Sequence, residues 1–316
     1  MKRTLAATGL LIATLTACGR PPVPSSSNPV LEISAAAHRQ EVETWSRERD
    51  ERLRQPESWL SLVGLGWLEE GENQVGSAAG VAVPLPAERA PATVGTIRRD
   101  GAEVRFRPAP GVPILLDGQL VTGEVTLAAD SSDKPSVLAL GSLRLYLIQR
   151  GDRLGIRVKD REGPLFATFH GMARFAIDPA WRVLARWEPY DPPKRIGIPT
   201  VLGTIEESPS PGAAVFDRDG VTYRLEPILE EGSDELFFIF GDRTNGKESY
   251  GAGRFLYTPM PSADGRVVLD FNKAYNPPCV FSPWATCPVP PPQNKLALRV
   301  TAGELTFDSG AAHGTP

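Results

Sequence analysis

Residues 235–257 read ELFFIFGDRTNGKESYGAGRFLY, and this stretch decides between two folds. The glycine and lysine spacing from Gly241 to Lys247 matches a phosphate-binding P-loop. A P-loop needs a helix after the lysine, and a Ser or Thr directly following it to hold magnesium. Here Glu248 follows, and the continuation to Pro259 contains two further glycines, which disfavour a helix. We therefore expect no nucleotide to bind.

The same stretch predicts a β-hairpin instead. Asn245 and Gly246 tolerate positive φ best, as a two-residue type I′ turn requires at both central positions. Counting outward from this turn places Arg254 opposite Phe237. In this register the glycines after the turn face aromatic residues, which cover exposed backbone. Two antiparallel strands are therefore expected.

A single helix is expected before the strands. Residues 34–55 lack Gly and Pro and carry apolar residues at near-helical spacing, Val42, Trp45 and Leu53. The charges of this segment indicate a solvated face, with His38 at the surface. After Pro56 the chain consists of short β-branched and aromatic runs separated by Gly, Pro and Asp-Gly. The predicted fold class is therefore all-β with one N-terminal helix.

The strand-forming part divides into two expected units, a β-sandwich over residues 56–160 and a second β-sheet or barrel unit over 161–310, with a tail at 311–316. In the first unit, residues 153–160 alternate polar and apolar side chains, as a strand with one wet face does. Each unit has enough residues for its own core.

Residues 59–150 loosely resemble the forkhead-associated β-sandwich. Ser77, rather than the Arg that reads phosphate in that family, follows Gly76. No Ser-x-x-His element follows either. The resemblance therefore implies a similar fold without phosphothreonine recognition.

The N-terminus resembles a bacterial lipoprotein signal. Two basic residues precede an apolar run that is too short for a permanent membrane helix. Residues 15–18, Leu-Thr-Ala-Cys, resemble the lipobox. We expect removal of residues 1–17, acylation of Cys18 with fatty acids such as palmitate, and a Pro/Ser-rich tether over 18–33. Gly19 indicates anchoring in the outer membrane, facing the periplasm.

Charge argues against a nucleic-acid partner. The formal net charge is −4, and Lys and Arg are interspersed with Asp and Glu. Nucleic acid requires clustered basic residues. The expected partners are therefore the membrane, through the lipid on Cys18, and a small polar ligand; no cofactor is expected.

Two cysteines remain after lipidation, Cys279 and Cys287 in CVFSPWATC. In an oxidising compartment they are expected to form a disulfide, which stabilises by roughly 2 to 3 kcal/mol on the chain-entropy model. A metal site is the alternative. Zinc needs about four ligands, and the chain adds only His38, His170 and His313, so the disulfide is favoured.

A long Pro-rich loop, residues 268–294, gathers polar side chains around this cysteine pair. Such a loop is suited to positioning binding groups. Its alternative role is a structural plug whose Asn and Asp side chains satisfy turn backbone. A calcium loop fails, because Lys273 and Tyr275 stand where a ligand and a glycine are needed. The sequence leaves plug and site open.

Three motifs together resemble the bacterial and archaeal family catalogued as domain of unknown function 1684: WLSLVGLGWLEEGENQVGS, the hairpin at 242–257, and DFNKAYNPPC through TCPVPPPQNKL. The likeness covers most of residues 59–304. The positions that match its motifs are Asp242, Thr244, Gly246, Lys247, Glu248, Tyr250, Gly253, Arg254, Asp270, Asn272, Tyr275, Asn276, Cys279, Cys287 and Asn294. The resemblance implies no particular activity.

Three function classes follow. A Ser-His-Asp hydrolase is disfavoured, because His170 is the sole histidine in the body of the domain and no Gly-x-Ser-x-Gly elbow occurs. Catalysis by the candidates Glu248, Asp270 and Tyr275 is the alternative to ligand binding, and a structural envelope lipoprotein is third. The predicted function is binding of a small polar or anionic ligand by Asp242, Lys247, Tyr250, Arg254, Asn272, Asn276 and Asn294.

Overall fold

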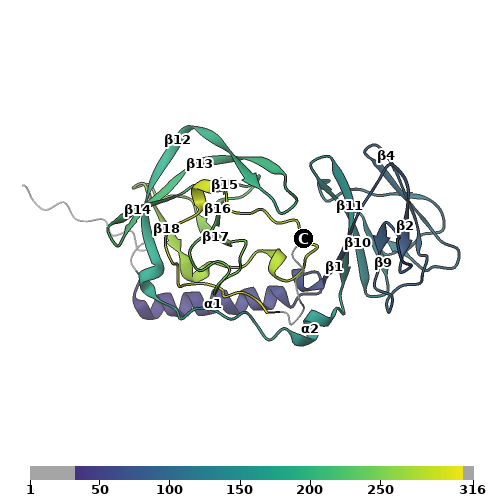
Figure 1. Ribbon diagram of the computed structural model, residues 1–316, viewed down its shortest axis with the longest axis horizontal. Helices are drawn as coiled ribbons and strands as arrows, with labels where there is room; N and C mark the ends of the chain where they lie inside the picture. Colours follow the sequence, from purple (N-terminus) through teal and green to yellow (C-terminus); the bar gives the residue numbers. More distant parts are fainter. Residues whose placement is uncertain (1–32, 309–316) are drawn as a thin grey trace, which may run out of the picture. The chain divides into compact units, whose positions relative to one another are not determined.

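The computed structural model describes residues 33–308. Its long helix α1 (Ala35–Leu53) is followed mainly by β-strands (Figure 1), which confirms the predicted all-β class with one N-terminal helix. The five-residue helix α2 (Pro164–Thr168) was not expected. None of the helices in this described part is long and apolar enough to cross a membrane. The predicted signal, the tether with Cys18 except for its last residue, and the whole of the predicted tail lie outside the described residues.

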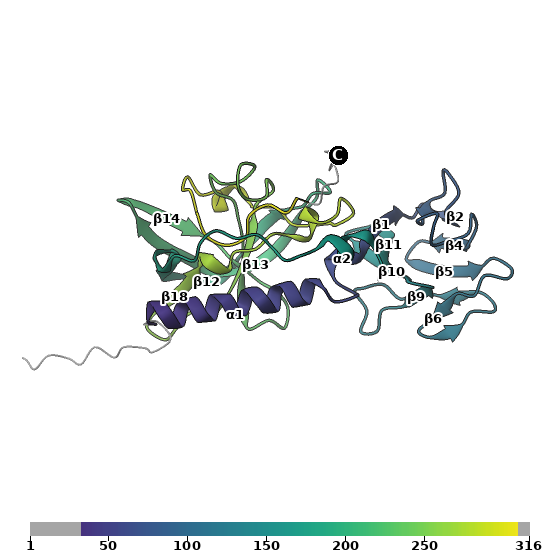
Figure 2. The same ribbon diagram turned by 90° about the horizontal axis from the view of Figure 1, so that it is seen from below.

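Local sequence sets both ends of α1. The Ser34 Oγ accepts a hydrogen bond from the Ala37 N–H at 3.2 Å, so Ser34 is the N-cap. The helix ends three residues before Pro56, which could not continue it. Figures 1 and 2 show α1 running along the strands of residues 182–270, where it contacts the 3-10 turns η2 (Pro179–Trp181) and η3 (Phe271–Lys273).

The strands of residues 62–160 form two sheets. The six-stranded sheet has the order β1 (Leu62–Trp67), β11 (Arg153–Asp160), β10 (Leu143–Arg150), β9 (Val137–Leu140), β6 (Leu115–Leu116), β7 (Gln119–Leu120). The five-stranded sheet has the order β3 (Val83–Pro84), β2 (Gly71–Gly76), β4 (Gly95–Asp100), β5 (Glu103–Pro108), β8 (Val125–Thr126). Both contribute to one apolar cluster, including Val75, Phe106 and Ile156, so they form a sandwich.

Strand β11 departs from the expected one-sided pattern. Its residues from Leu154 to Val158 are all buried, as is Asp160. Arg157, predicted on a wet face, is 8% exposed because the Trp59 ring and Thr286 lie against its guanidinium. The prediction of a solvated face on this strand is therefore wrong.

The strands of residues 182–270 form two further sheets. One has the order β14 (Val221–Leu225), β13 (Ile205–Arg218), β12 (Arg182–Pro199), β18 (Arg266–Asp270); the other has β15 (Ile228–Leu229), β16 (Glu235–Phe240), β17 (Arg254–Pro259). Alternation along β16 sends Phe238 into one apolar cluster and Phe237 into another. Hydrogen bonding between the described strands does not close this unit into a barrel.

The hairpin of β16 and β17 exists, but its predicted register is wrong. Arg254 pairs with Phe240, not Phe237, so the connection runs from Gly241 to Gly253. The Thr244 carbonyl accepts hydrogen bonds from the next N–H groups, those of Lys247, Glu248 and Ser249, at 3.0 to 3.2 Å. This wider turn needs positive φ at Gly246 (+73°) but not at Asn245. Strand β17 follows, so the helix of a P-loop is missing.

Gly253 also has a different role from the one predicted. It does not face an aromatic residue across the hairpin; its φ is +99°, and a Cβ there would lie 2.4 Å from Pro290 Cγ and 2.8 Å from the Phe240 carbonyl oxygen. The position therefore requires glycine because the proline-rich segment and β16 approach its backbone closely.

Candidate functional site

Helix α1 is held by a buried histidine. His38 is 1% exposed, and its Nε2 lies 2.8 Å from Asp270 Oδ2 at the end of β18. The other Asp270 oxygen accepts from the Asn272 backbone N–H (3.2 Å) and side-chain amide (2.9 Å). The prediction of His38 as a surface residue is wrong, because a partner 232 residues away covers it. The predicted catalytic candidate Asp270 is thus engaged in docking the helix.

A second polar contact holds the C-terminal half of α1. Arg49 donates to Glu304 Oε1 at 3.3 Å and to the Asn276 carbonyl at 3.2 Å, and its guanidinium lies 4.6 Å from the Tyr275 ring centroid. Glu304 is fully buried, and Arg174 lies 3.6 Å from the same oxygen. Burial raises the pKa of Glu304, and the charges of Arg49 and Arg174 oppose this rise. Glu304 is the last residue of the expected family likeness, and no sequence motif marks it as a functional residue.

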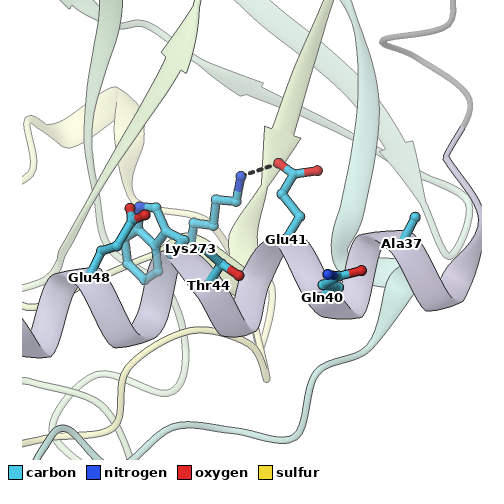
Figure 3. Close-up of a pocket in the computed structure, with 7 residues that line it drawn as sticks. Ala37, Gln40, Glu41, Thr44, Glu48 and Lys273 are labelled. Carbon is cyan, nitrogen blue, oxygen red and sulfur yellow. Dashed lines mark hydrogen bonds and ion pairs between the residues drawn. The ribbon is translucent and has the colours of Figure 1, made fainter.

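Between these two anchors α1 borders an open groove of about 450 Å³ (Figure 3), lined by Ala37, Gln40, Glu41, Thr44, Trp45, Glu48 and Lys273. Lys273 comes from η3 in the family motif, and its ammonium donates to the Glu41 carboxylate. Burial opposes ionisation of Glu41, but this hydrogen bond and the Lys273 charge prevail and lower its pKa. The Glu41–Lys273 ion pair therefore lines the groove together with the carboxylate of Glu48.

Trp45 joins the groove to an aromatic cluster. Its ring centroid lies 6.3 Å from that of Tyr275, which in turn lies 5.8 Å from Phe255 and 6.4 Å from Tyr257. The predicted catalytic candidate Tyr275 thus lies behind the wall of the groove, and burial raises its pKa. The groove combines an indole surface with an amide, a hydroxyl and carboxylates, which suits a small polar ligand with one flat apolar face.

The predicted ligand contacts Asp242 and Arg254 bind each other. Their closest atoms are 2.6 Å apart, and both side chains are fully buried. Arg254 also donates to the Val300 carbonyl at 2.9 Å and to the Ala302 carbonyl. Desolvation lowers the pKa of Arg254, opposed by the Asp242 charge. This pair therefore fixes the C-terminal segment against the hairpin, away from solvent.

The remaining predicted residues of the hairpin turn lie outside the groove. Lys247 is exposed, and Glu248 pairs with Arg299. Tyr250 packs half-buried in an apolar cluster that includes Phe281. Burial raises the pKa of Tyr250 to about 12. Glu248 pairs with Arg299 and Asp270 with His38, so the two candidate carboxylates are engaged in separate contacts.

The three predicted asparagines tie loops to their neighbours. Asn294 bonds the Glu226 backbone N–H and carbonyl, both at 2.8 Å, and the Ile239 carbonyl at 3.0 Å. Asn272 binds the Asp178 backbone, and the Asn276 amide donates to the Leu305 carbonyl. These contacts are those of a structural plug. A ligand role for the three asparagines stays a prediction.

Cys279 and Cys287 are neighbours, as the disulfide prediction requires. The Cys279 backbone N–H donates to the Cys287 Sγ at 3.1 Å, and both side chains are present as thiols. The disulfide itself stays a prediction. The sequence signal that could have drawn attention to the groove is Trp45, a large aromatic side chain on an otherwise charged helix.

Comparison with known proteins gives one family match. Residues 167–305 match the family described as "Protein of unknown function (DUF1684)". An uncharacterized protein of Haloarcula marismortui, solved by NMR, is 33% identical over 44% of this chain and 78% of its own, with a TM-score of 0.38. No curated protein matches the sequence.

Forkhead-associated domains also match. One, from a study of phosphothreonine-dependent interactions of these domains, is 20% identical over 30% of this chain and 93% of its own, with a TM-score of 0.21. A second has the same identity and TM-score and is covered over 89% of its length.

Proposed function

Residues 167–305 belong to the DUF1684 family, and from this premise we propose that the chain is an exported, lipid-anchored protein that binds a small polar ligand in the α1 groove. One observation carries the binding proposal: Trp45 lines an open cavity of about 450 Å³ together with the polar side chains of Gln40, Thr44 and Glu48. Pockets of this volume accommodate small organic ligands.

The charges of the groove favour a neutral ligand over an anionic one. Glu41 and Glu48 outnumber Lys273, and Lys273 is already paired with Glu41. An anion would meet a net negative surface, whereas a polyhydroxylated ring could place its apolar face on the indole and its hydroxyls against the amide and carboxylates. We therefore assign the ligand to the saccharide class.

Anchoring completes the proposal. The lipobox at residues 15–18 supports acylation of Cys18, and the Pro/Ser-rich segment that follows supports a tether to the outer membrane on its periplasmic side. The membrane is then the first partner and the saccharide the second. Hydrolysis by Glu248 and Asp270 is disfavoured, because these carboxylates have separate partners, Arg299 and His38.

Saturation-transfer NMR with N-acetylglucosamine and glucose tests the binding proposal. We expect dissociation constants on the order of 1 mM, as for a small ligand in an open groove, equivalent to about −4 kcal/mol. Trp45→Ala should weaken binding at least about tenfold and Glu48→Gln by a smaller factor. The matched controls are Trp284→Ala, an exposed tryptophan elsewhere (40% exposed), and Glu51→Gln, an exposed glutamate of α1 that does not line the groove.

Inorganic phosphate serves as the anionic probe. Phosphate bound more tightly than either sugar would replace the saccharide with an anion, and saccharide binding that survives Trp45→Ala would place the site elsewhere. Absence of binding by the wild-type protein at about 50 mM sugar, well above the expected constant, would reject the proposal.

A further inference from the structure

The two thiols differ in their surroundings. Cys287 is 4% exposed and packs with Leu62 and Ala285, whereas Cys279 is partly exposed. The Cys279 N–H donates to the Cys287 Sγ at 3.1 Å, and the Cys279 Sγ lies 3.5 Å from the Ala285 carbonyl oxygen. Cys279 is therefore the more accessible residue of the pair, and Cys287 is enclosed.

A buried cation lies beside this pair. Arg157 of β11 is 8% exposed, its Nε has no hydrogen-bond partner, and one terminal nitrogen donates to Thr286 Oγ1 at 3.3 Å. Thr286 directly precedes Cys287 in the chain. A buried guanidinium with an unsatisfied N–H is costly unless a negative group forms nearby. A thiolate on Cys279 is such a group.

The electrostatics agree with this geometry. The hydrogen bond from the Cys287 thiol, the backbone N–H groups and the charge of Arg157 together lower the pKa of Cys279, against the effect of burial. Burial raises the pKa of Cys287. The accessible sulfur is thus the better nucleophile, and the buried sulfur is held as a thiol until it is needed.

We propose that Cys279 and Cys287 are a redox-active dithiol in which Cys279 exchanges with external disulfides and Cys287 resolves the mixed disulfide. The observation that distinguishes this pair from a purely structural disulfide is Arg157, which a structural crosslink does not require. The inference is independent of ligand binding in the α1 groove.

The chemistry balances with a disulfide as the oxidant. The Cys279 thiolate attacks one sulfur of the external disulfide R–S–S–R, forming Cys279–S–S–R and releasing one thiolate, R–S⁻. Cys287 then loses its proton, and its thiolate attacks the Cys279 sulfur and displaces the second R–S⁻. The protein is oxidised to the intramolecular disulfide, and the external disulfide is reduced to two thiols.

Mass spectrometry of the reduced chain treated with oxidised glutathione tests the assignment. The Cys18→Ser variant is used as the parent, so that Cys279 and Cys287 are its only thiols. The parent should form the intramolecular disulfide without retaining glutathione. Adding Cys287→Ser should trap one glutathione on Cys279, whereas adding Cys279→Ser should slow the reaction at least about tenfold, because the remaining thiol is buried.

Arg157→Met tests the cation. Removing its charge raises the pKa of Cys279, so the midpoint of the pH–rate profile for alkylation by iodoacetamide should move to higher pH and the rate at pH 7 should fall at least about threefold. Arg150→Met is the matched control, because Arg150 also donates to Thr286 Oγ1, at 3.2 Å, but its charge is paired with the Asp130 carboxylate at 2.8 Å. Arg157→Lys keeps the charge and should restore most of the rate if the fold is intact by circular dichroism.

Three results would overturn the proposal. Equal reaction rates of the two single-cysteine variants would remove the assigned asymmetry. A pH–rate profile of alkylation that Arg157→Met leaves unchanged would show that Arg157 does not lower the pKa of Cys279. A disulfide that millimolar reduced glutathione fails to open would show a structural crosslink instead of an exchanging pair.

Discussion

Arg254 is a motif residue whose partner lies within the chain. A cation inside a hairpin of aromatic residues suggested a partner anion from solution, but the structure supplies that anion from the chain, as Asp242. The pair also binds the C-terminal segment, through the Val300 and Ala302 carbonyls. Its first contribution is therefore to stability, because a guanidinium buried this completely must be neutralised and hydrogen-bonded.

Removing one member of this pair should be strongly destabilising. Arg254→Met leaves the Asp242 carboxylate buried without its cation, and we expect the free energy of unfolding to fall by about 3 to 5 kcal/mol. Urea denaturation followed by circular dichroism measures the change. Lys247→Ala, at an exposed position of the same turn, is the control and should change stability by less than about 0.5 kcal/mol.

Gly246 gives an intermediate test of the same turn. Its φ of +73° is unfavourable for a β-branched residue, so Gly246→Val should lower the free energy of unfolding by about 1 to 3 kcal/mol.

A loss of stability for Arg254→Met no larger than that for Lys247→Ala would mean that the buried pair of Arg254 and Asp242 contributes little.

At the scale of elements, α1 is positioned by polar contacts as well as by its apolar residues. Val42 and Leu53 are buried as the helical spacing predicted, and the helix bounds agree with the prediction to within two residues at each end. His38 and Arg49 could not be placed from sequence, because Asp270 and Glu304 lie more than two hundred residues further along the chain. Local patterns predict where a helix begins and ends, but the buried charges that hold it depend on distant chain segments.

Arg49→Met should loosen α1. It removes the hydrogen bonds to Glu304 and the Asn276 carbonyl and the contact over Tyr275, and we expect a loss of about 2 kcal/mol, with faster amide exchange in α1. Arg47→Met is the control, because Arg47 is exposed and contacts only Thr44 among the described residues. Equal effects of the two variants would show that Arg49 does not dock the helix.

The loss in Arg49→Met should depend on pH. The folded-state pKa of Glu304 is raised above its ordinary value of 4.5. The folded protein therefore binds this proton more tightly than the unfolded chain does. The stabilisation that results is fully present below pH 4.5 and is lost as the pH rises through the folded-state pKa. Removing Arg49 raises the folded pKa further. The variant should therefore be most deficient at neutral pH and approach the wild type as the pH falls toward 4.5, and a deficit independent of pH would contradict this coupling.

At the scale of the whole molecule, strand texture predicted two groups of β-sheets, and the strands do pair within residues 62–160 and within 182–270. Pairing register was less predictable, since the turn at Thr244 is closed by a carbonyl that accepts three N–H groups rather than by a tight Asn-Gly turn. The groove was missed for a related reason. Trp45 and Lys273 belong to opposite ends of the chain, and neither forms a recognisable site alone.

Membrane attachment is the prediction that concerns the entire chain. Residues 15–18 resemble a lipobox, so the proposed acylated residue is Cys18. One acyl chain alone gives only marginal membrane binding, whereas several chains give stable anchoring. The wild-type protein expressed in a bacterial host should therefore incorporate labelled palmitate and sediment with membranes, and Cys18→Ser should lose both properties. Cys279→Ser, which keeps the lipobox, is the matched control and should remain labelled. Palmitate retained by Cys18→Ser would mean that another residue carries the lipid, and a wild-type protein that stays unlabelled in the soluble fraction would remove the basis for an outer-membrane location.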